Sequence, residues 1–134
     1  MKLTLYFQNF MSNHINPVID NTEFLYRGII KQFWNFENNR PSSAIFKDSK
    51  GVSVDRDYAR NENDCVEFLQ SRIDFFAICK IQTEKVRELN AIAKYIPVED
   101  NIYHSEIHES ESIAQMRGSK PTKLRDNSVV VYKK

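Results

Sequence analysis

Short strand-like segments dominate this sequence, and helix-like segments interrupt them at irregular intervals. The most strand-like segment is 74–82 (DFFAICKIQ), which is rich in aromatic and β-branched residues and carries one internal charge. The other strand-like segments are 1–10, 23–32, 44–46, 51–55, 101–108 and 127–132, of which 23–32 also fits a short helix. The helix-like segments are 61–73, 84–90 and 110–115. This order is too irregular for a doubly wound sheet, so we predict an α+β fold with a mixed or mostly antiparallel sheet and about three helices.

The composition is that of one soluble domain. The chain has 134 residues, is 41% hydrophobic, and contains no internal repeat and only three glycines, so we predict a single domain over residues 1–134. A net charge of +1 is too small to attract the whole protein toward nucleic acid or membranes. No apolar run approaches the ~18 residues of a membrane span, and 1–10 lacks the features of a signal peptide, so we expect a cytoplasmic protein without membrane contact.

Local signals fix some element ends. Asn61 or Asn63 can cap the helix at 61–73, and Thr83 can cap the helix at 84–90, because their side chains accept hydrogen bonds from free backbone N–H groups. Residues 12–22 read as a loop. Cys65 and Cys79 each lie within an apolar periodic segment, which indicates small core residues rather than a disulfide or a metal site.

Two strand-like segments carry groups suited to ligand binding. Arg27 precedes Gly28 on the segment 23–32; a guanidinium can bind phosphate or carboxylate with two hydrogen bonds, and glycine lets a ligand approach the backbone. A surface arginine beside a turn glycine is the alternative. Alternation places Ser53 and Asp55 on one face of 51–55, either as a solvent face or as a pair that orients a ligand.

The segment 101–108 (NIYHSEIH) carries the densest set of ionisable groups. As a strand it places His104, Glu106 and His108 on one face, at steps of roughly 6.5–7 Å that are too long for one metal ion but suited to flanking a substrate. As a helix it would bring His104 and His108 together as metal ligands. The polar outer face of an edge strand is the third interpretation.

The sequence contains no nucleophile elbow, Walker loop or GxGxxG motif, but three short motifs occur in a suggestive order. Arg27 in LYRG, Ser53 in GVSVD and Glu106 in HSEIH together resemble the arginine, serine, glutamate order of the ADP-ribosyltransferase fold. The stretch from GVSVD to DFFAICKIQTEKVRELN also resembles the RES-domain relatives of that fold. In those relatives the glutamate comes from the helix after the serine-type strand, which here would be Glu67.

The resemblance implies a transferase or glycohydrolase that acts on NAD or a related nucleotide, with NAD as the substrate and no metal. Loss of nicotinamide leaves an oxocarbenium-like ribose, which a carboxylate stabilises. By this resemblance the catalytic residues would be Glu106, His104 and His108, with one of the histidines either activating the acceptor or holding the ribose. The residues that would bind the nucleotide are Arg27 on the pyrophosphate, Ser53 on the nicotinamide ribose, and Tyr58 or Trp34 stacked on the ring.

Other functions also fit the sequence. The aromatic segment 33–36, together with acidic residues in 99–111 and basic residues in 117–134, favours a non-catalytic protein-binding regulator, for example of the toxin–antitoxin kind. The six basic residues between Arg117 and Lys134 could instead contact nucleic acid, with His104 and His108 as acid and base of an RNA- or DNA-processing protein. A metal-dependent hydrolase that uses the same two histidines is the remaining alternative.

Overall fold

The computed structural model describes residues 15–134, so the strand predicted at 1–10 lies outside the described residues. The strands are β1 (Phe24–Ile29), β2 (Trp34–Asn35), β3 (Arg40–Pro41), β4 (Val52–Arg56), β5 (Ala77–Gln82), β6 (Ile92–Tyr95), β7 (His104–His108) and β8 (Val129–Lys133). The α-helices are α2 (Glu62–Arg72), α3 (Thr83–Glu88) and α4 (Lys120–Asp126), and the 3-10 helices are η1 (Lys31–Phe33) and η2 (Ser43–Phe46).

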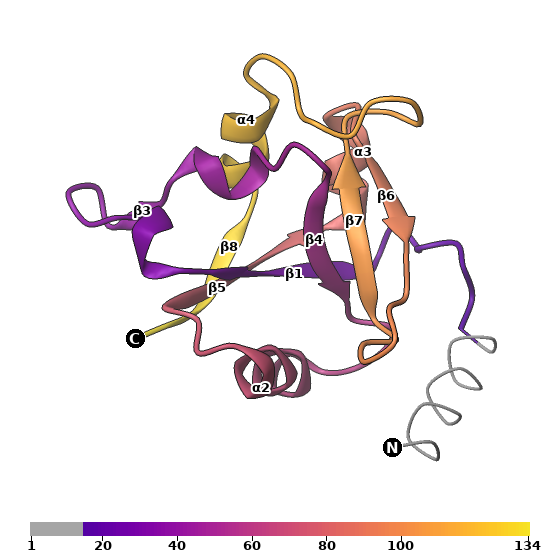
Figure 1. Cartoon of the computed structure of the whole chain (residues 1–134), viewed down its shortest axis with the longest axis horizontal. Coiled ribbons are helices and arrows are strands. Elements are labelled where there is room, and N and C mark those ends of the chain that lie inside the picture. The colour runs from indigo at the N-terminus through magenta and orange to yellow at the C-terminus, as the bar shows by residue number, and fades with distance from the viewer. Residues whose placement is uncertain (1–14) are drawn as a thin grey trace.

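Six strands form one sheet in the order β6-β7-β4-β1-β5-β8, and all five of its pairings are antiparallel. A separate two-stranded sheet joins β2 and β3. The predicted α+β fold with a mostly antiparallel sheet is therefore confirmed. The main sheet is strongly twisted, because β4, β6 and β7 stand upright in Figure 1 whereas β1 and β5 run across the view.

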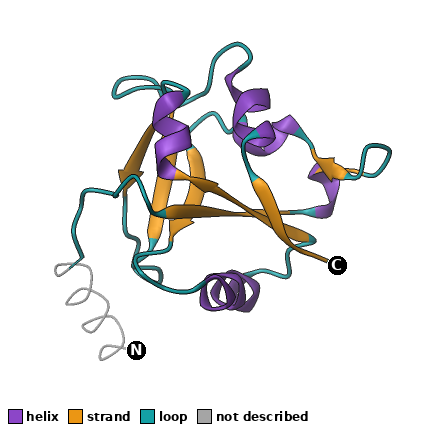
Figure 2. Ribbon diagram, turned by 180° about the vertical axis from the view of Figure 1, so that it is seen from behind, coloured by secondary structure: helices purple, strands orange, loops and turns teal. Residues whose placement is uncertain are grey.

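Helices cover both faces of the sheet (Figures 1 and 2). The larger core lies on the side of α3, α4 and η2. Leu25 and Ile29 of β1 point to this side, where they join Phe46 of η2, Val86 of α3 and Leu124 of α4, all of them fully buried. Period-2 alternation of the strand thus gives one face of β1 to the larger core.

Helix α2 covers the opposite face. Its buried residues Cys65 and Leu69 pack on Tyr26 of β1 and Ile78 of β5. The helix begins where the sequence predicts, because the Asn61 side chain accepts a 2.8 Å hydrogen bond from a backbone N–H group of the first turn. Among the described helices, α2 is the one that packs on this face of the sheet.

Several predicted elements are confirmed. The segments 23–32, 74–82 and 101–108 contain β1, β5 and β7, and 61–73 contains α2. The segments 51–55 and 127–132 cover β4 and β8 except for the last residue of each strand, Arg56 and Lys133. Residues 15–22 contain no helix or strand, in agreement with the predicted loop. Cys65 and Cys79 are free and buried, as predicted, and burial raises the pKa of each thiol to about 11.

Other local predictions are wrong. Residues 44–46 belong to the 3-10 helix η2 and not to a strand, because the Ser42 side chain accepts a hydrogen bond from Ala44 N and starts a helical turn. Thr83 is the first residue of α3 rather than its cap; its hydroxyl donates to the Glu23 backbone oxygen instead. Residues 110–115 form a bent loop instead of the predicted helix, and the backbone N–H group of Ser110 donates to the backbone oxygen of Ile113 across this loop.

The sequence analysis also missed β6 and α4. The segment of β6 is only four residues long and none of its side chains is fully buried, so it shows no clear alternation. Helix α4 begins beyond Gly118, where we expected a helix to stop, and it carries a proline in its first turn. Proline is common at that position, because its missing N–H group has no partner within the helix. Pro121 is therefore the signal that could have located α4.

Candidate functional site

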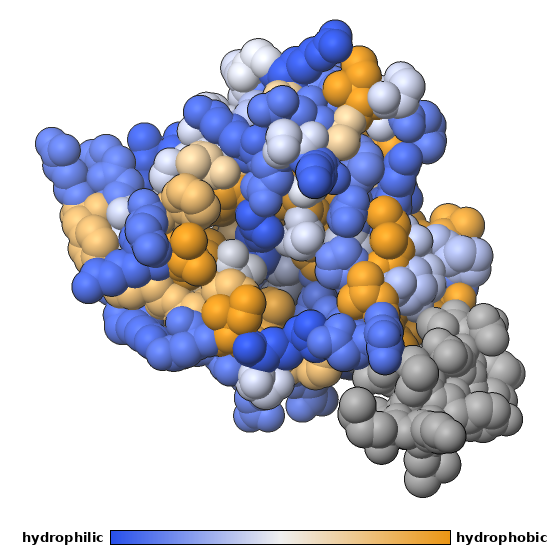
Figure 3. All heavy atoms as spheres, viewed as in Figure 1, coloured by the Kyte–Doolittle hydropathy of each residue, from blue (hydrophilic) through white to orange (hydrophobic). Residues whose placement is uncertain are grey.

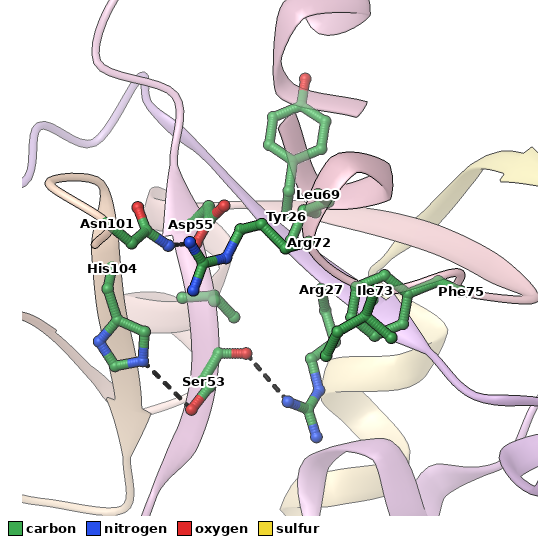
Figure 4. Close-up of a pocket in the computed structure, with 12 residues that line it drawn as sticks. Tyr26, Arg27, Ser53, Asp55, Leu69, Arg72, Ile73, Phe75, Asn101 and His104 are labelled. Carbon is green, nitrogen blue, oxygen red and sulfur yellow. Dashed lines mark hydrogen bonds between the residues drawn. The ribbon is translucent and has the colours of Figure 1, made fainter. Parts of the chain in front are cut away.

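A pocket of about 270 Å³ opens on the α2 side of the sheet, between β1, β4, β7 and the C-terminal end of α2 (Figure 4). It is lined by Tyr26, Arg27, Gly28, Ser53, Val54, Asp55, Leu69, Arg72, Ile73, Phe75, Asn101 and His104. Pockets for drug-sized ligands usually enclose roughly 300–1,000 Å³. The pocket is therefore large enough for one ring-sized part of a ligand.

The pocket exists because β1 and β4 separate. These two strands pair only at Leu25↔Arg56 and Tyr26↔Asp55, whereas β4 continues to pair with β7 as far as Val52. The backbone oxygen of Ser53 therefore faces a gap instead of a β1 amide. Strong twist between the two halves of the sheet is what opens this gap.

Arg27 fills the gap from the β1 side. By alternation its Cβ is on the same face as Leu25 and Ile29, opposite to Ser53, but the long side chain turns into the opening between the strands. Its Nη1 donates to the Ser53 oxygen at 3.0 Å and its Nε donates to Ile45 O at 3.1 Å. Its Nη2 contacts the carboxylate of Asp48 at 3.1 and 3.2 Å. The guanidinium is thus held in place by protein groups, one of which is an exposed carboxylate.

Ser53 lies between Arg27 and His104 (Figure 4). The His104 Nδ1 atom is 2.8 Å from the backbone oxygen of Ile96, and since a carbonyl only accepts, Nδ1 carries a proton. In the neutral ring Nε2 is then an acceptor, and the Ser53 hydroxyl, at 3.3 Å, donates to it. The lone pairs of the hydroxyl remain available to the pocket.

Glu106 and His108 share the face of His104 but lie beside the pocket. Glu106 is directly opposite Ser53 in the β4–β7 register, and its Oε1 is 2.7 Å from His108 Nε2. A Cβ at Gly51, where φ is +102°, would lie only 2.5 Å from the same nitrogen. Glycine at this position therefore lets the Glu106–His108 pair pack against the start of β4. The predicted strand geometry, with three ionisable groups on one face, is what β7 forms.

The structure does not bring the other sequence candidates to this pocket. Trp34 is buried on the far side of the sheet, where its ring packs 5.6 Å from that of Phe76. Tyr58 lies outside the pocket with its ring 5.1 Å from the guanidinium of Arg56. Glu67 is exposed on α2 and does not line the pocket.

Gly28 has a different neighbour from the one we expected. A Cβ at Gly28 would lie 2.4–2.5 Å from the ring of Phe75, so this glycine admits the phenylalanine ring and not a ligand. Phe75 and the half-exposed Ile73 give the pocket an apolar wall. On the face of the molecule shown in Figure 3, hydrophobic side chains lie among hydrophilic ones.

Asp55 forms the polar interior of the pocket together with Asn101. Its Oδ1 accepts a 2.8 Å hydrogen bond from Asn101 Nδ2, whereas its buried Oδ2 has no hydrogen-bond partner among residues 15–134. Burial raises the pKa of Asp55, although the Asn101 hydrogen bond and the charge of Arg60 act in the opposite direction. The sequence placed Asp55 correctly on the face of Ser53, but nothing in it marked Asn101, which comes from the β6–β7 connection.

Arg72 lies at the mouth of the pocket. It donates to the backbone oxygen of Asp100 at 3.0 Å and to its carboxylate, also at 3.0 Å. Both side chains are partly or largely exposed, so the pair contributes at most about 1 kcal/mol and can rearrange easily. The sequence analysis missed Arg72, because the last turn of an amphipathic helix carries no specific signal for a ligand.

The basic C-terminal segment forms ion pairs rather than one open patch. Lys120 binds Glu109, Arg125 binds the adjacent Asp126, and Lys134 binds Asp74 at 2.6 Å. Half of the six basic residues between Arg117 and Lys134 are therefore paired with carboxylates. This arrangement gives the nucleic-acid interpretation no defined surface.

Within the described part of the chain, no group of three or more histidine, cysteine, aspartate or glutamate side chains is arranged to hold a metal ion. Among residues 15–134, none of the helices has the length and apolar character needed to cross a bilayer. Comparison of the chain with protein-family models, with curated proteins and with solved structures finds no match.

Proposed function

We propose that the chain binds NAD or a related nucleotide at this pocket and cleaves or transfers at the glycosidic bond. The observation that carries the proposal is the order β7-β4-β1 in the sheet. It makes the strands of Glu106, Ser53 and Arg27 immediate neighbours, although these residues are far apart in the sequence. The arginine, serine and glutamate of the resemblance thus come from three adjacent strands.

The geometry supports distinct roles for these residues. Arg27 presents a guanidinium whose ligand Asp48 has a side chain that is 41% exposed, so a phosphate oxygen can replace the carboxylate. Ser53 offers hydroxyl lone pairs to a sugar hydroxyl. A pocket of about 270 Å³ suits the nicotinamide or ribose part, and the rest of a dinucleotide would extend over the rim.

The proposed reaction breaks the bond between ribose C1′ and the pyridinium nitrogen, and the electron pair leaves with nicotinamide. The Glu106 carboxylate, held by His108, stabilises the positive charge that develops on the ribose. Water or another nucleophile then forms a bond to C1′, and its proton passes to His104 Nε2 or to Glu106. Atoms and charge balance without a metal or a further reactant.

Ligand-induced thermal stabilisation tests this proposal. Unfolding entropies near 2.1 cal/mol/K per residue give about 0.28 kcal/mol/K for 134 residues. NAD at one hundred times its dissociation constant stabilises by about 2.7 kcal/mol, and should therefore raise the Tm by about 10 °C. An unchanged Tm at millimolar NAD would refute the proposal.

Two variants separate binding from chemistry. Arg27→Ala should weaken NAD binding by about tenfold to a hundredfold, because it removes a charged hydrogen-bonding group. Glu106→Gln should leave binding nearly intact and slow nicotinamide release by on the order of 10²–10³. Arg40→Ala in β3 and Glu111→Gln, an exposed residue, are matched controls that should change neither property. Equal turnover by Glu106→Gln and the wild type would contradict the role of Glu106.

A further inference from the structure

Asp55 is the one polar side chain of the pocket with an unexplained atom. The residue is only 3% exposed, and its Oδ2 is buried without a hydrogen-bond donor among residues 15–134. Buried polar atoms in folded proteins nearly always have a partner, because an unpartnered one loses its hydration without compensation. A carboxylate oxygen in this state, in a residue that lines a pocket, is a candidate for a ligand contact.

The groups around Asp55 do not supply the missing donor. Asn101 already donates to the other carboxylate oxygen, Oδ1. The guanidinium groups whose charge acts on Asp55 are those of Arg60, from the turn before α2, and Arg72, from the end of α2. Arg60 donates to the backbone oxygens of Arg56 and Asp57, and Arg72 donates to Asp100. Two guanidinium groups thus act on Asp55, but no donor among residues 15–134 reaches its Oδ2.

The groups that lack a donor at this end of the pocket are accordingly acceptors. Ser53 donates its proton toward His104, so its lone pairs face the pocket, and Asp55 Oδ2 can only accept while ionised. A phosphate or carboxylate would be repelled at this position, since it also carries only acceptors. The complementary ligand group is a hydroxyl or an amide NH₂.

We propose that Asp55 is a specificity-determining residue, whose Oδ2 accepts a hydrogen bond from an amide NH₂ or a hydroxyl of the bound nucleotide. This inference rests on the proposed function and extends it to a residue outside the arginine, serine, glutamate set. In NAD the matching donors are the carboxamide of nicotinamide and the hydroxyls of the adjoining ribose. Discrimination arises because a ligand without a donor would leave a buried carboxylate oxygen unpaired in the complex.

Asp55→Asn tests the proposal, because it keeps the size of the side chain and replaces one acceptor with a donor. The amide oxygen can still accept from Asn101, and the buried charge is removed. We expect the Tm of the free variant at pH 7 to rise by roughly 2–7 °C. We also expect the Tm shift produced by NAD to fall by at least two-thirds. A purely structural role for Asp55 would lower the Tm of the free protein instead.

Three ligands identify the donor. ADP-ribose carries the hydroxyls without the amide, and nicotinamide carries the amide without the ribose. A ligand that raises the Tm of the wild type but not that of Asp55→Asn contains the group that Asp55 binds. Asp126→Asn, an exposed position on α4, is the control and should leave every shift unchanged.

The outcomes distinguish this inference from the proposed function. If NAD and ADP-ribose shift the wild type and Asp55→Asn equally, the role of Asp55 is refuted while the proposed function stands. If Asp55→Asn is less stable than the wild type when free, Asp55 is structural and the inference is refuted. If none of the three ligands shifts the wild type, both proposals are refuted together.

Discussion

Replacing Arg56 with methionine should strongly destabilise the protein. Arg56 ends β4 and is 1% exposed. Its Nε and Nη2 contact the two carboxylate oxygens of Glu23 at 2.9 and 2.7 Å, and its remaining hydrogen bonds go to the backbone oxygens of Asn16 and Val18. Methionine matches the length of the arginine stem but supplies no charge and no donor. The substitution therefore leaves a buried carboxylate and two carbonyls without their partner.

Removing one partner of a buried ion pair costs about 3–5 kcal/mol. With about 0.28 kcal/mol/K for 134 residues, this corresponds to a fall in Tm of roughly 11–18 °C. The double variant Arg56→Met/Glu23→Gln should recover part of the loss, because it no longer contains an uncompensated carboxylate. Lys85→Met is the control: its pair with Glu88 is about half exposed and should contribute less than about 1 kcal/mol.

The pH dependence gives a second test of the same pair. Burial alone would raise the pKa of Glu23, but the hydrogen bonds from Arg56 and from the Asp20 backbone N–H group hold it below the usual value of 4.5. A lowered pKa stabilises the fold above pH 4.5, and this stabilisation is lost as the pH falls through the folded-state pKa. The Tm difference between wild type and Arg56→Met should therefore shrink between pH 7 and pH 3. A difference below about 4 °C at pH 7, or one that grows in acid, would refute this reasoning.

Three further predictions concern the pocket wall, the helix beside it and the core. Gly28→Ala should destabilise by about 1–3 kcal/mol in chemical denaturation, because the new Cβ would lie 2.4 Å from the Phe75 ring; full stability would contradict this contact. Asn61→Ala should cost about 1 kcal/mol in the same assay, since it removes the N-cap of α2, whereas an unchanged midpoint would show that the cap is dispensable. Cys65 and Cys79, whose pKa values burial raises to about 11, should react with a thiol reagent much more slowly at pH 8 in the native protein than in denaturant; rapid native labelling would contradict their burial.

Local patterns explain why part of the site could be predicted. The period-2 alternation of 101–108 is an intrinsic property of an extended chain, so it places His104 and Glu106 on one face of β7 whatever the rest of the fold does. Alternation likewise placed Ser53 with Asp55. The helix cap at Asn61 depends on atoms three residues apart and was equally readable.

Contacts between distant segments explain the failures. Thr83 has the residue type of a cap, but its hydroxyl bonds to Glu23, sixty residues away. The sequence predicted that Gly28 lets a ligand approach the backbone, but the ring of Phe75, from the connection after α2, occupies the space beside it. Trp34 was a candidate for stacking on the nucleotide ring, but its side chain is buried in the core. None of these partners is visible in the local sequence.

The sequence by itself determined the strand-rich α+β character, the faces on which alternating side chains lie, and the position of α2, because backbone geometry and capping act over a few residues. Only the tertiary structure decided that β7, β4 and β1 are neighbours and that β1 and β4 separate to admit Arg27. It also decided that Asp55 is buried with one oxygen that has no hydrogen-bond partner within residues 15–134. These features depend on strand pairing, sheet twist and the position of α2. Such interactions join residues that are dozens of positions apart, so no short stretch of the chain contains them.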